Sequence, residues 1–463
     1  MSCDASSCQS SNCHRNGDAT RPRHALPPVD DLAALCLKCK SARPFSSSSS
    51  AVGGGREDDA RFCADCFRSN LFGKFRHSVI SNAMISPADN VLVAFSGGPA
   101  SRVALQFVHE MQYKVQRDFD ASRDRSLRVF GVGVAFIDES SAYSVPMEEA
   151  NKVREDIRWI VSSLSPPEKE LHIFPLEEIY SNGLNNGKEK LMELLDMAGD
   201  ATGKEDLLVH LRVLSLQKIA TDNGYTRVVL GSCTSKIACH VITATVKGQG
   251  YSLPADIQYA DARWDVPVVL PLRDCLEQEI DTLCHLESLK TTDLPHKESL
   301  STINTLVSSF VALLQKENPS RESTIVRTAG KLTPFHFNRI PELKDDNVPL
   351  ATRRRQKRSS LKLNGSLSSE SFCPICYGPV NPTAHSLSVE NTDQPRCNIF
   401  VDSCCLSCRF QILPQDPSQM EHFMELWPQT FVTGPKQQAR SLHLSSLREQ
   451  IQDCLLSDSD NES

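Results

Sequence analysis

The chain has 463 residues, a formal net charge of −7, 40% hydrophobic residues and 18 cysteines. This acidic balance excludes a protein that coats nucleic acid through its overall charge, so any such contact requires a local basic patch. No apolar run approaches the roughly 18 residues that a membrane span requires, so we expect no membrane partner.

The first 33 residues are rich in Ser, Asn and Pro, and we expect a disordered tail there. They contain no apolar segment after a basic start, so we expect no secretory signal. Cysteines in such a chain favour metal or thiol chemistry over disulfides, which form in oxidising compartments. The cysteine usage therefore predicts a reducing, cytoplasmic location.

Residues 34–80 carry a first cysteine-rich module, which the low-complexity insert SSSSSAVGGGREDD interrupts. Its cysteines form two CxxC pairs, Cys36 with Cys39 and Cys63 with Cys66, separated by 23 residues. A CxxC turn presents both sulfurs to one ion, and two such turns give the tetrahedral site that Zn²⁺ accepts. The spacing predicts a zinc-ribbon-like module that metal binding stabilises. Four unrelated buried thiols and an iron–sulfur cluster are the alternatives.

Residues 81–290 show an α/β pattern. The candidate strands are Val91–Phe95, Val129–Ile137, Leu171–Phe174, Arg227–Leu230 and Val266–Leu270. Helical patterns alternate with these strands, and that order favours a mostly parallel sheet with crossover helices. The sequence therefore predicts an α/β fold flanked by N-terminal and C-terminal cysteine-rich zinc modules.

The segment VLVAFSGGPASRVAL, residues 91–105, joins the first strand to an apolar-periodic helix. Gly97 and Gly98 lack the Cβ atoms that would keep a phosphate from the backbone, and N–H groups at a helix start attract anions. Ser96 and Ser101 add hydroxyl groups to this loop. It has neither the lysine of a Walker loop nor the third glycine of a dinucleotide fingerprint. We expect either a weak phosphate contact or a purely structural turn.

Residues 291–345 form a predicted helical extension. It holds one apolar-periodic helix, SLSTINTLVSSFVALLQKE, followed by a Pro-interrupted stretch. A polar, basic linker at 346–372 leads to the second cysteine-rich module at 373–430. The remaining segment, 431–463, ends in the acidic tail SDSDNES.

The second module predicts a further four-sulfur metal site. A CxxC pair is followed after 28 residues by Cys405, which lies with Cys408 in the sequence CCLSC. Cys404 and Cys397 compete for the place of the fourth ligand, and zinc is the expected ion with an iron–sulfur cluster as the alternative. The expected ligands are Cys373, Cys376, Cys405 and Cys408.

Basic residues gather in two places. The group in and after the first cysteine module is Lys38, Lys40, Arg61, Arg68, Lys74 and Arg76. The run in the linker is Arg353, Arg354, Arg355, Lys357 and Arg358. Cations attract phosphates without reading sequence, so both groups are candidates for RNA contact. A solvated linker or a nuclear-import-like patch is the alternative explanation of the second group.

The pattern SGG-x-x-S after the first strand resembles the pyrophosphate loop of the ATP pyrophosphatases that adenylate tRNA bases. The paired CxxC module before it, and the sequence KFR at 74–76, narrow the resemblance to the tRNA 2-thiolation group. The resemblance spans residues 34–290 and continues in order to the C-terminal cysteines. It implies the PP-loop ATP pyrophosphatase fold.

The chain departs from the catalytic members of that group. Ala100 stands where the active loop carries Asp. Glu205 and Leu208 fall where a CxxC pair is expected ahead of the helix LRVLSLQKIA. The resemblance therefore implies a degenerate loop that has lost most of its chemistry.

A second departure follows the fourth candidate strand, in GSCTSKIACH. Catalytic members read Gly-His-Asn-x-x-Asp there, and this chain lacks the carboxylate that would organise Mg²⁺ and phosphate. Cys233 and Cys239 are candidates for a replacement nucleophile with His240 as the nearest base, but we interpret them as small buried cysteines. Cys275 lies just after a strand, and we interpret it as a structural residue.

The resemblance implies a divergent, non-catalytic subunit that pairs with a catalytic PP-loop subunit as a heterodimer. The joint reaction uses ATP to activate the C2 oxygen of the wobble uridine, position 34, in tRNAs for Lys, Glu and Gln. Sulfur then comes from a thiocarboxylated ubiquitin-like carrier. tRNA and this carrier are therefore implied as further partners.

Two other functions are considered. A zinc-ribbon scaffold would bridge proteins without touching tRNA, and an apolar patch on the module would favour it. An independent ATP-dependent thiolating or amidating enzyme is disfavoured by Ala100 and by the missing Asp and Cys positions.

Overall fold

The computed structural model describes residues 35–45, 61–122, 128–180, 186–292, 302–318, 320–338, 351, 353–354, 367, 371–381 and 396–428. The predicted tail at 1–33, the insert at 46–59 and the segment 431–463 lie outside the described residues, as does most of the basic linker.

Within the described residues, six strands form one sheet in the order β3-β2-β1-β4-β6-β5. The strands are β1 (Asn90–Ala94), β2 (Gly131–Asp138), β3 (Glu170–Pro175), β4 (Arg227–Val229), β5 (Ala260–Asp261) and β6 (Val268–Val269). Neighbouring strands are parallel except β5 with β6. The mostly parallel α/β fold expected from the sequence is confirmed.

The central strands are buried on both faces because helices cover both sides of a parallel sheet. Val91 and Val93 of β1 lie in one apolar cluster, whereas Leu92 between them lies in the other. In β4, Val228 and Val229 divide between the two clusters in the same way. This alternation follows from the two-residue period of a strand.

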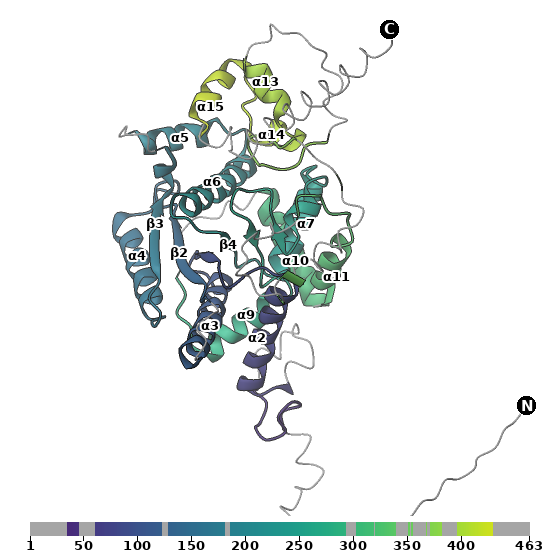
Figure 1. Cartoon of the computed structure of the whole chain (residues 1–463). Coiled ribbons are helices and arrows are strands. Elements are labelled where there is room, and N and C mark those ends of the chain that lie inside the picture. The colour runs from purple at the N-terminus through teal and green to yellow at the C-terminus, as the bar shows by residue number, and fades with distance from the viewer. Residues whose placement is uncertain are drawn as a thin grey trace, which may run out of the picture.

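Each face of the sheet has its own layer of helices (Figure 1). One layer contains α2 (Ala64–Ser81), α3 (Pro99–Ala121), α4 (Met147–Ser162) and α9 (Glu277–Leu286). The other contains the 3₁₀ turn η2 (Leu176–Tyr180), α5 (Gly187–Met197), α6 (Ala201–Asp222), α7 (Thr234–Val246) and α8 (Leu253–Asp256).

Helix α2 continues directly from the second CxxC pair of the first cysteine module. Its residues Phe67, Leu71 and Phe75 recur at helical spacing and are almost fully buried in the apolar cluster on one side of the sheet. The helix therefore anchors the first cysteine module to the α/β core through apolar packing.

The region after the sheet holds two described helices, α10 (Ile303–Glu317) and α11 (Ser320–Ala329), where the sequence predicts one. The Asn318 side chain accepts the Ser320 N–H at 2.9 Å, so the chain restarts as a helix soon after α10 ends. Both helices pack against α7. The sequence-based prediction treated this stretch as interrupted by proline and missed α11. A proline just before a helix does not break that helix.

The C-terminal cysteine region contributes α13 (Arg396–Ser403), α14 (Leu406–Gln411), the 3₁₀ turn η4 (Pro417–Gln419) and α15 (Met420–Leu426). Figure 1 shows these helices at the end of the molecule opposite to α2. Phe423 and Trp427 are buried in the same cluster as Leu207 and Leu211 of α6. The second module thus packs onto the α/β core. Among the described residues, no helix is both long and apolar enough to cross a membrane.

We predict that Phe75→Ala lowers the free energy of unfolding by about 3–5 kcal/mol, because the Phe75 ring is fully buried and packs on Phe107 of α3. Gly73→Ala in the same helix is the control. A Cβ at Gly73 meets nothing within 4 Å, so this change should stabilise the protein by about 0.5–1 kcal/mol. Urea titration followed by circular dichroism measures the free energy of unfolding of both variants. Equal changes in the two variants would contradict the packing of α2.

Candidate metal centres and phosphate loop

The first cysteine group closes two turns around one point. The sulfur atoms of Cys36, Cys39, Cys63 and Cys66 all lie within 4.8 Å of one another. The first turn is held by the Cys36 N–H, which donates to the Ala42 carbonyl at 2.8 Å. The second turn begins at Cys63, which is the N-cap of α2, and Cys66 lies in the first turn of that helix.

Hydrogen bonds and burial act on these thiols in opposite directions. Hydrogen bonds from the Ser41 hydroxyl and N–H lower the pKa of Cys39 to about 5. Burial, followed by the neighbouring thiols, raises the pKa of Cys66 to about 12. A bound cation favours the thiolate form of every ligand. It would therefore remove this difference in protonation between Cys39 and Cys66.

The second cysteine group has the same arrangement, and its ligand atoms come from two separate segments. The sulfurs of Cys373, Cys376, Cys405 and Cys408 lie within 4.8 Å of one another. The Gly378 N–H donates to the Cys376 sulfur at 3.3 Å. The Cys408 N–H donates to the Cys405 sulfur at 3.4 Å. Backbone donors therefore face two of the sulfurs, as they do where thiolates bind a metal.

The two competing cysteines stand outside this group of four. Cys404 is buried beside it, and its carbonyl accepts a hydrogen bond from Arg409 at 3.0 Å. Cys397 lines a different cavity of about 390 Å³, together with Val401 and Met420. The structure thus brings together four of the six candidate sulfurs.

The sulfur spacing fits a single tetrahedral ion. A Zn–S bond of about 2.3 Å places tetrahedral sulfurs roughly 3.8 Å apart. Cys39 and Cys63 sulfurs are 3.8 Å apart, and Cys376 and Cys405 sulfurs are 3.7 Å apart. A four-iron cluster would bind its sulfurs to separate irons and so hold them farther apart. Both groups can therefore hold a metal ion.

The loop between β1 and α3 satisfies its own hydroxyl groups. The Ser96 hydroxyl donates to the Ser101 hydroxyl at 3.1 Å, and the Ser101 hydroxyl donates to the Gly98 carbonyl at 2.9 Å. Gly98 is the N-cap of α3, and Ala100 in the first turn is buried. The two serines that would face a phosphate are thus engaged within the loop.

Two other segments pack closely on this loop. Gly97 has a φ of +92°, and its carbonyl accepts the Thr292 N–H at 3.1 Å. A Cβ on Gly97 would lie 2.0 Å from the Thr292 carbonyl oxygen. A Cβ on Gly231, after β4, would lie 2.8 Å from the backbone of Ala100 and Ser101. The glycines therefore allow close backbone contacts at the carboxyl edge of the sheet.

The cysteines near this edge are not activated. Burial raises the pKa of Cys233 and of Cys239 to about 11, and it also raises the pKa of Cys275. His240, the nearest base in the sequence, instead contacts the Asp256 carboxylate at 3.2 Å. A thiol with a raised pKa is a weak nucleophile at neutral pH.

The residues at the positions of the missing CxxC pair serve packing and hydrogen bonding. Leu208 is buried in the apolar cluster around α6. The Glu205 carboxylate accepts a hydrogen bond from the Asn304 amide of α10 at 2.9 Å. The hydrogen bond of Glu205 ties α6 to α10.

Sequence analysis missed the acidic residues at the end of β2. Asp138 forms an ion pair with Arg154 at 2.5 Å, and Glu139 forms a two-pronged pair with Arg212. Strand β2 ends in Asp138, so a signal existed in the sequence: a carboxylate at the end of a buried strand. Both carboxylates are neutralised by these arginines.

The basic residues of the first module divide into two sets. Arg68 pairs with Glu110 and Glu287, and Lys74 pairs with Glu279. The remaining residues are exposed and have no ion-pair partner within the described part of the chain; they are Lys38, Lys40, Arg61 and Arg76. Of the linker run, only Arg353 and Arg354 belong to the described residues.

Comparison with known proteins decides the family. A curated relative from Arabidopsis thaliana, named Cytoplasmic tRNA 2-thiolation protein 2, is 54% identical over 99% of this chain and 99% of its own length. The chain belongs to the cytoplasmic tRNA 2-thiolation protein 2 family. The family model with that description matches residues 302–409. A relative from Oryza sativa subsp. indica is 49% identical over 93% of this chain and 90% of its own length, and one from Homo sapiens is 27% identical over 69% and 72%.

Among solved structures, the chain is similar to the U34-tRNA thiolase NcsA from Methanococcus maripaludis, determined with its [4Fe-4S] cluster. The sequence identity is 15% and the TM-score is 0.47, over 65% of this chain and 87% of the thiolase chain.

We predict that Gly97→Ala destabilises the protein by about 2–4 kcal/mol, because the new Cβ meets both a positive φ and a backbone carbonyl. Gly224→Ala is the matched control, since Gly224 has a φ of +70° but a Cβ there meets nothing within 4 Å. It should cost only about 1 kcal/mol. Thermal unfolding followed by circular dichroism measures the difference in stability. Equal losses of stability in the two variants would show that a Cβ at position 97 does not clash with Thr292.

Proposed function

We propose that this protein is a non-catalytic subunit required for 2-thiolation of the wobble uridine, position 34, of cytosolic tRNAs for Lys, Glu and Gln. Membership in the cytoplasmic tRNA 2-thiolation protein 2 family supports this role. The non-catalytic part of the proposal rests on the side chains at the carboxyl edge of the sheet, which are not free to react. Its serines are engaged within the loop, and its thiols are buried with raised pKa values.

A catalytic partner is a necessary part of this proposal. Ala100 is buried where a catalytic loop would carry Asp, so this chain has no carboxylate there to organise Mg²⁺ and phosphate. We propose that a catalytic PP-loop subunit forms a heterodimer with this protein in the cytoplasm. That subunit would use ATP and receive sulfur from a thiocarboxylated ubiquitin-like carrier. Any ATP contact of Ser96, Gly97, Gly98 and Ser101 in this chain would be weak.

The first cysteine module is the proposed contact for tRNA. Arg68 and Lys74 hold α2 to the core through ion pairs, so their charge is already neutralised. Lys38 and Lys40 lie in the exposed first turn, Arg61 precedes the second CxxC pair, and Arg76 is exposed on α2. Cations of this kind attract phosphates and position an RNA without reading its sequence.

We propose that both cysteine groups bind zinc. The support is the donor set of four sulfurs in each group and the sulfur spacing near 3.8 Å. In each case the ion would hold two turns together and would leave no open position for a substrate.

We predict that cells lacking this protein lose 2-thiouridine and that the wild-type gene restores it.

Reversing the charge of Lys38, Lys40 and Arg61 should leave the protein folded and lower both tRNA binding and the 2-thiouridine level. The matched control reverses Lys152, Arg158 and Lys188, which are exposed cations in other helices. Nucleoside mass spectrometry of total tRNA measures the outcome. An unchanged 2-thiouridine level in the deleted cells would overturn the function and favour a scaffold.

We predict two zinc ions in each purified chain, and one after Cys376→Ser with Cys405→Ser. Elemental mass spectrometry of the purified protein gives the count. Iron in place of zinc, or no change in metal content after the double substitution, would contradict the assignment.

A further inference from the structure

The C-terminal cysteine group is built into the apolar core, unlike its N-terminal counterpart. Cys373 and Cys408 are fully buried in the cluster that contains Trp264 and Trp427. The Tyr377 ring, in the turn after Cys376, stacks on Trp264 with centroids 4.8 Å apart and an interplanar angle of 20°. The metal-binding turn therefore packs directly on the segment between β5 and β6.

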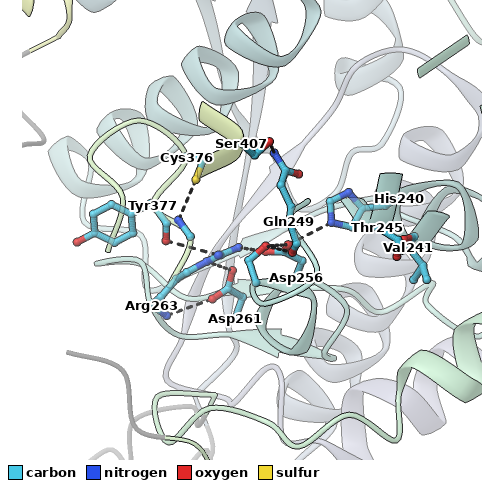
Figure 2. A network of polar contacts seen from close by, with 12 residues as sticks. His240, Val241, Thr245, Gln249, Asp256, Asp261, Arg263, Cys376, Tyr377 and Ser407 are labelled. Carbon is cyan, nitrogen blue, oxygen red and sulfur yellow. Dashed lines mark hydrogen bonds and ion pairs between the residues drawn. The ribbon is translucent and has the colours of Figure 1, made fainter. Parts of the chain in front are cut away.

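A buried arginine joins this turn to the same segment (Figure 2). Arg263 forms ion pairs with Asp256, at the end of α8, and with Asp261 of β5, the latter at 2.7 Å. Only 8% of its side chain is exposed. The Arg263 guanidinium also donates to the Tyr377 carbonyl at 3.5 Å. One cation thus connects α8, β5 and the turn that carries Cys376.

The second metal-binding turn is connected to the loop before α8. The Gln249 amide donates to the Ser407 hydroxyl at 3.0 Å, and Ser407 lies between Cys405 and Cys408 (Figure 2). Both turns of the second cysteine group therefore contact the segment that runs from α7 to β6.

The edge of the sheet at this point has little stability of its own. Strand β5 has two residues, and its pairing with β6 consists of Ala260 opposite Val269 and Asp261 opposite Val268. Two residues per strand are fewer than an independently stable hairpin requires. The contacts of Arg263 and Trp264 with the Tyr377 turn supply what the strand pairing lacks.

We propose that the C-terminal metal site is a clasp that holds the β5–β6 edge and α8 in place. A metal ion joins the turns at Cys376 and Cys405, which come from separate segments, and so fixes Tyr377 against Trp264 and Ser407 against Gln249. Loss of the ion frees the two turns, and the edge of the sheet opens with them. Metal loading at this site therefore controls the order of the β5–β6 edge and of α8.

The N-terminal site is the internal comparison. Its first turn, residues 35–45, contacts the rest of its own module: the Leu37 N–H donates to Arg61, and Phe45 meets Phe67 edge to face. Helix α2 is held to the core by Phe67, Leu71 and Phe75, which bind no metal. Loss of the N-terminal ion should therefore stay local.

Hydrogen–deuterium exchange of the full-length protein tests the clasp. Cys376→Ser with Cys405→Ser should speed exchange in peptides that cover residues 253–269 by about tenfold or more, while β1 and β2 stay protected. The matched control, Cys39→Ser with Cys66→Ser, should change those peptides by less than about twofold. Unchanged protection of residues 253–269 after loss of the C-terminal ion would overturn the proposal.

The reverse coupling gives a second test, because linkage between two sites is reciprocal. Trp264→Leu and Gln249→Ala keep all eight cysteines, and each should speed the loss of one zinc ion to a chelator by about tenfold. Trp159→Leu is the control, since Trp159 is 57% exposed and contacts Lys290. Equal zinc release from the wild-type protein and the Trp264 and Gln249 variants would show that the contacts do not carry the coupling.

Discussion

The structure depends on the burial of β1 on both faces. Val91 and Val93 face one helical layer and Leu92 faces the other, so β1 cannot shift by one residue without moving apolar side chains to the wrong side. This fixed strand sets the position of the loop at Ser96–Ser101 and of α3. The loop shape survives for a structural reason, because Gly97 must accept both a positive φ and the Thr292 backbone.

The loop thus keeps its shape although its hydroxyl groups and the nearby thiols are not free to react. Ser96 and Ser101 bond within the loop, and burial keeps Cys233 and Cys275 as thiols. In the proposed role, this chain contributes surfaces rather than reacting atoms. The two cysteine modules lie at opposite ends of the α/β core (Figure 1), and the proposed zinc ions give both ends a defined shape.

Sequence patterns predicted the features that local spacing determines. Five apolar runs became β1, β2, β3, β4 and β6, and the CxxC spacing identified the sulfurs that the fold brings together. The two-residue strand β5 has no periodicity to detect. The contact between Arg263 and Tyr377 joins residues 114 positions apart, and a single sequence carries no signal for such a pair. The helix α11 was missed because a proline before a helix looks like a break.

The most direct test of a required but non-catalytic subunit is a reaction with purified components. A catalytic PP-loop subunit, tRNA, ATP and a thiocarboxylated carrier would be combined with and without this protein, and 2-thiouridine would be counted by mass spectrometry. The account predicts product only when both subunits are present, and none from this protein without the catalytic subunit. Product formed by this protein without the catalytic subunit, or undiminished product from the catalytic subunit alone, would contradict it.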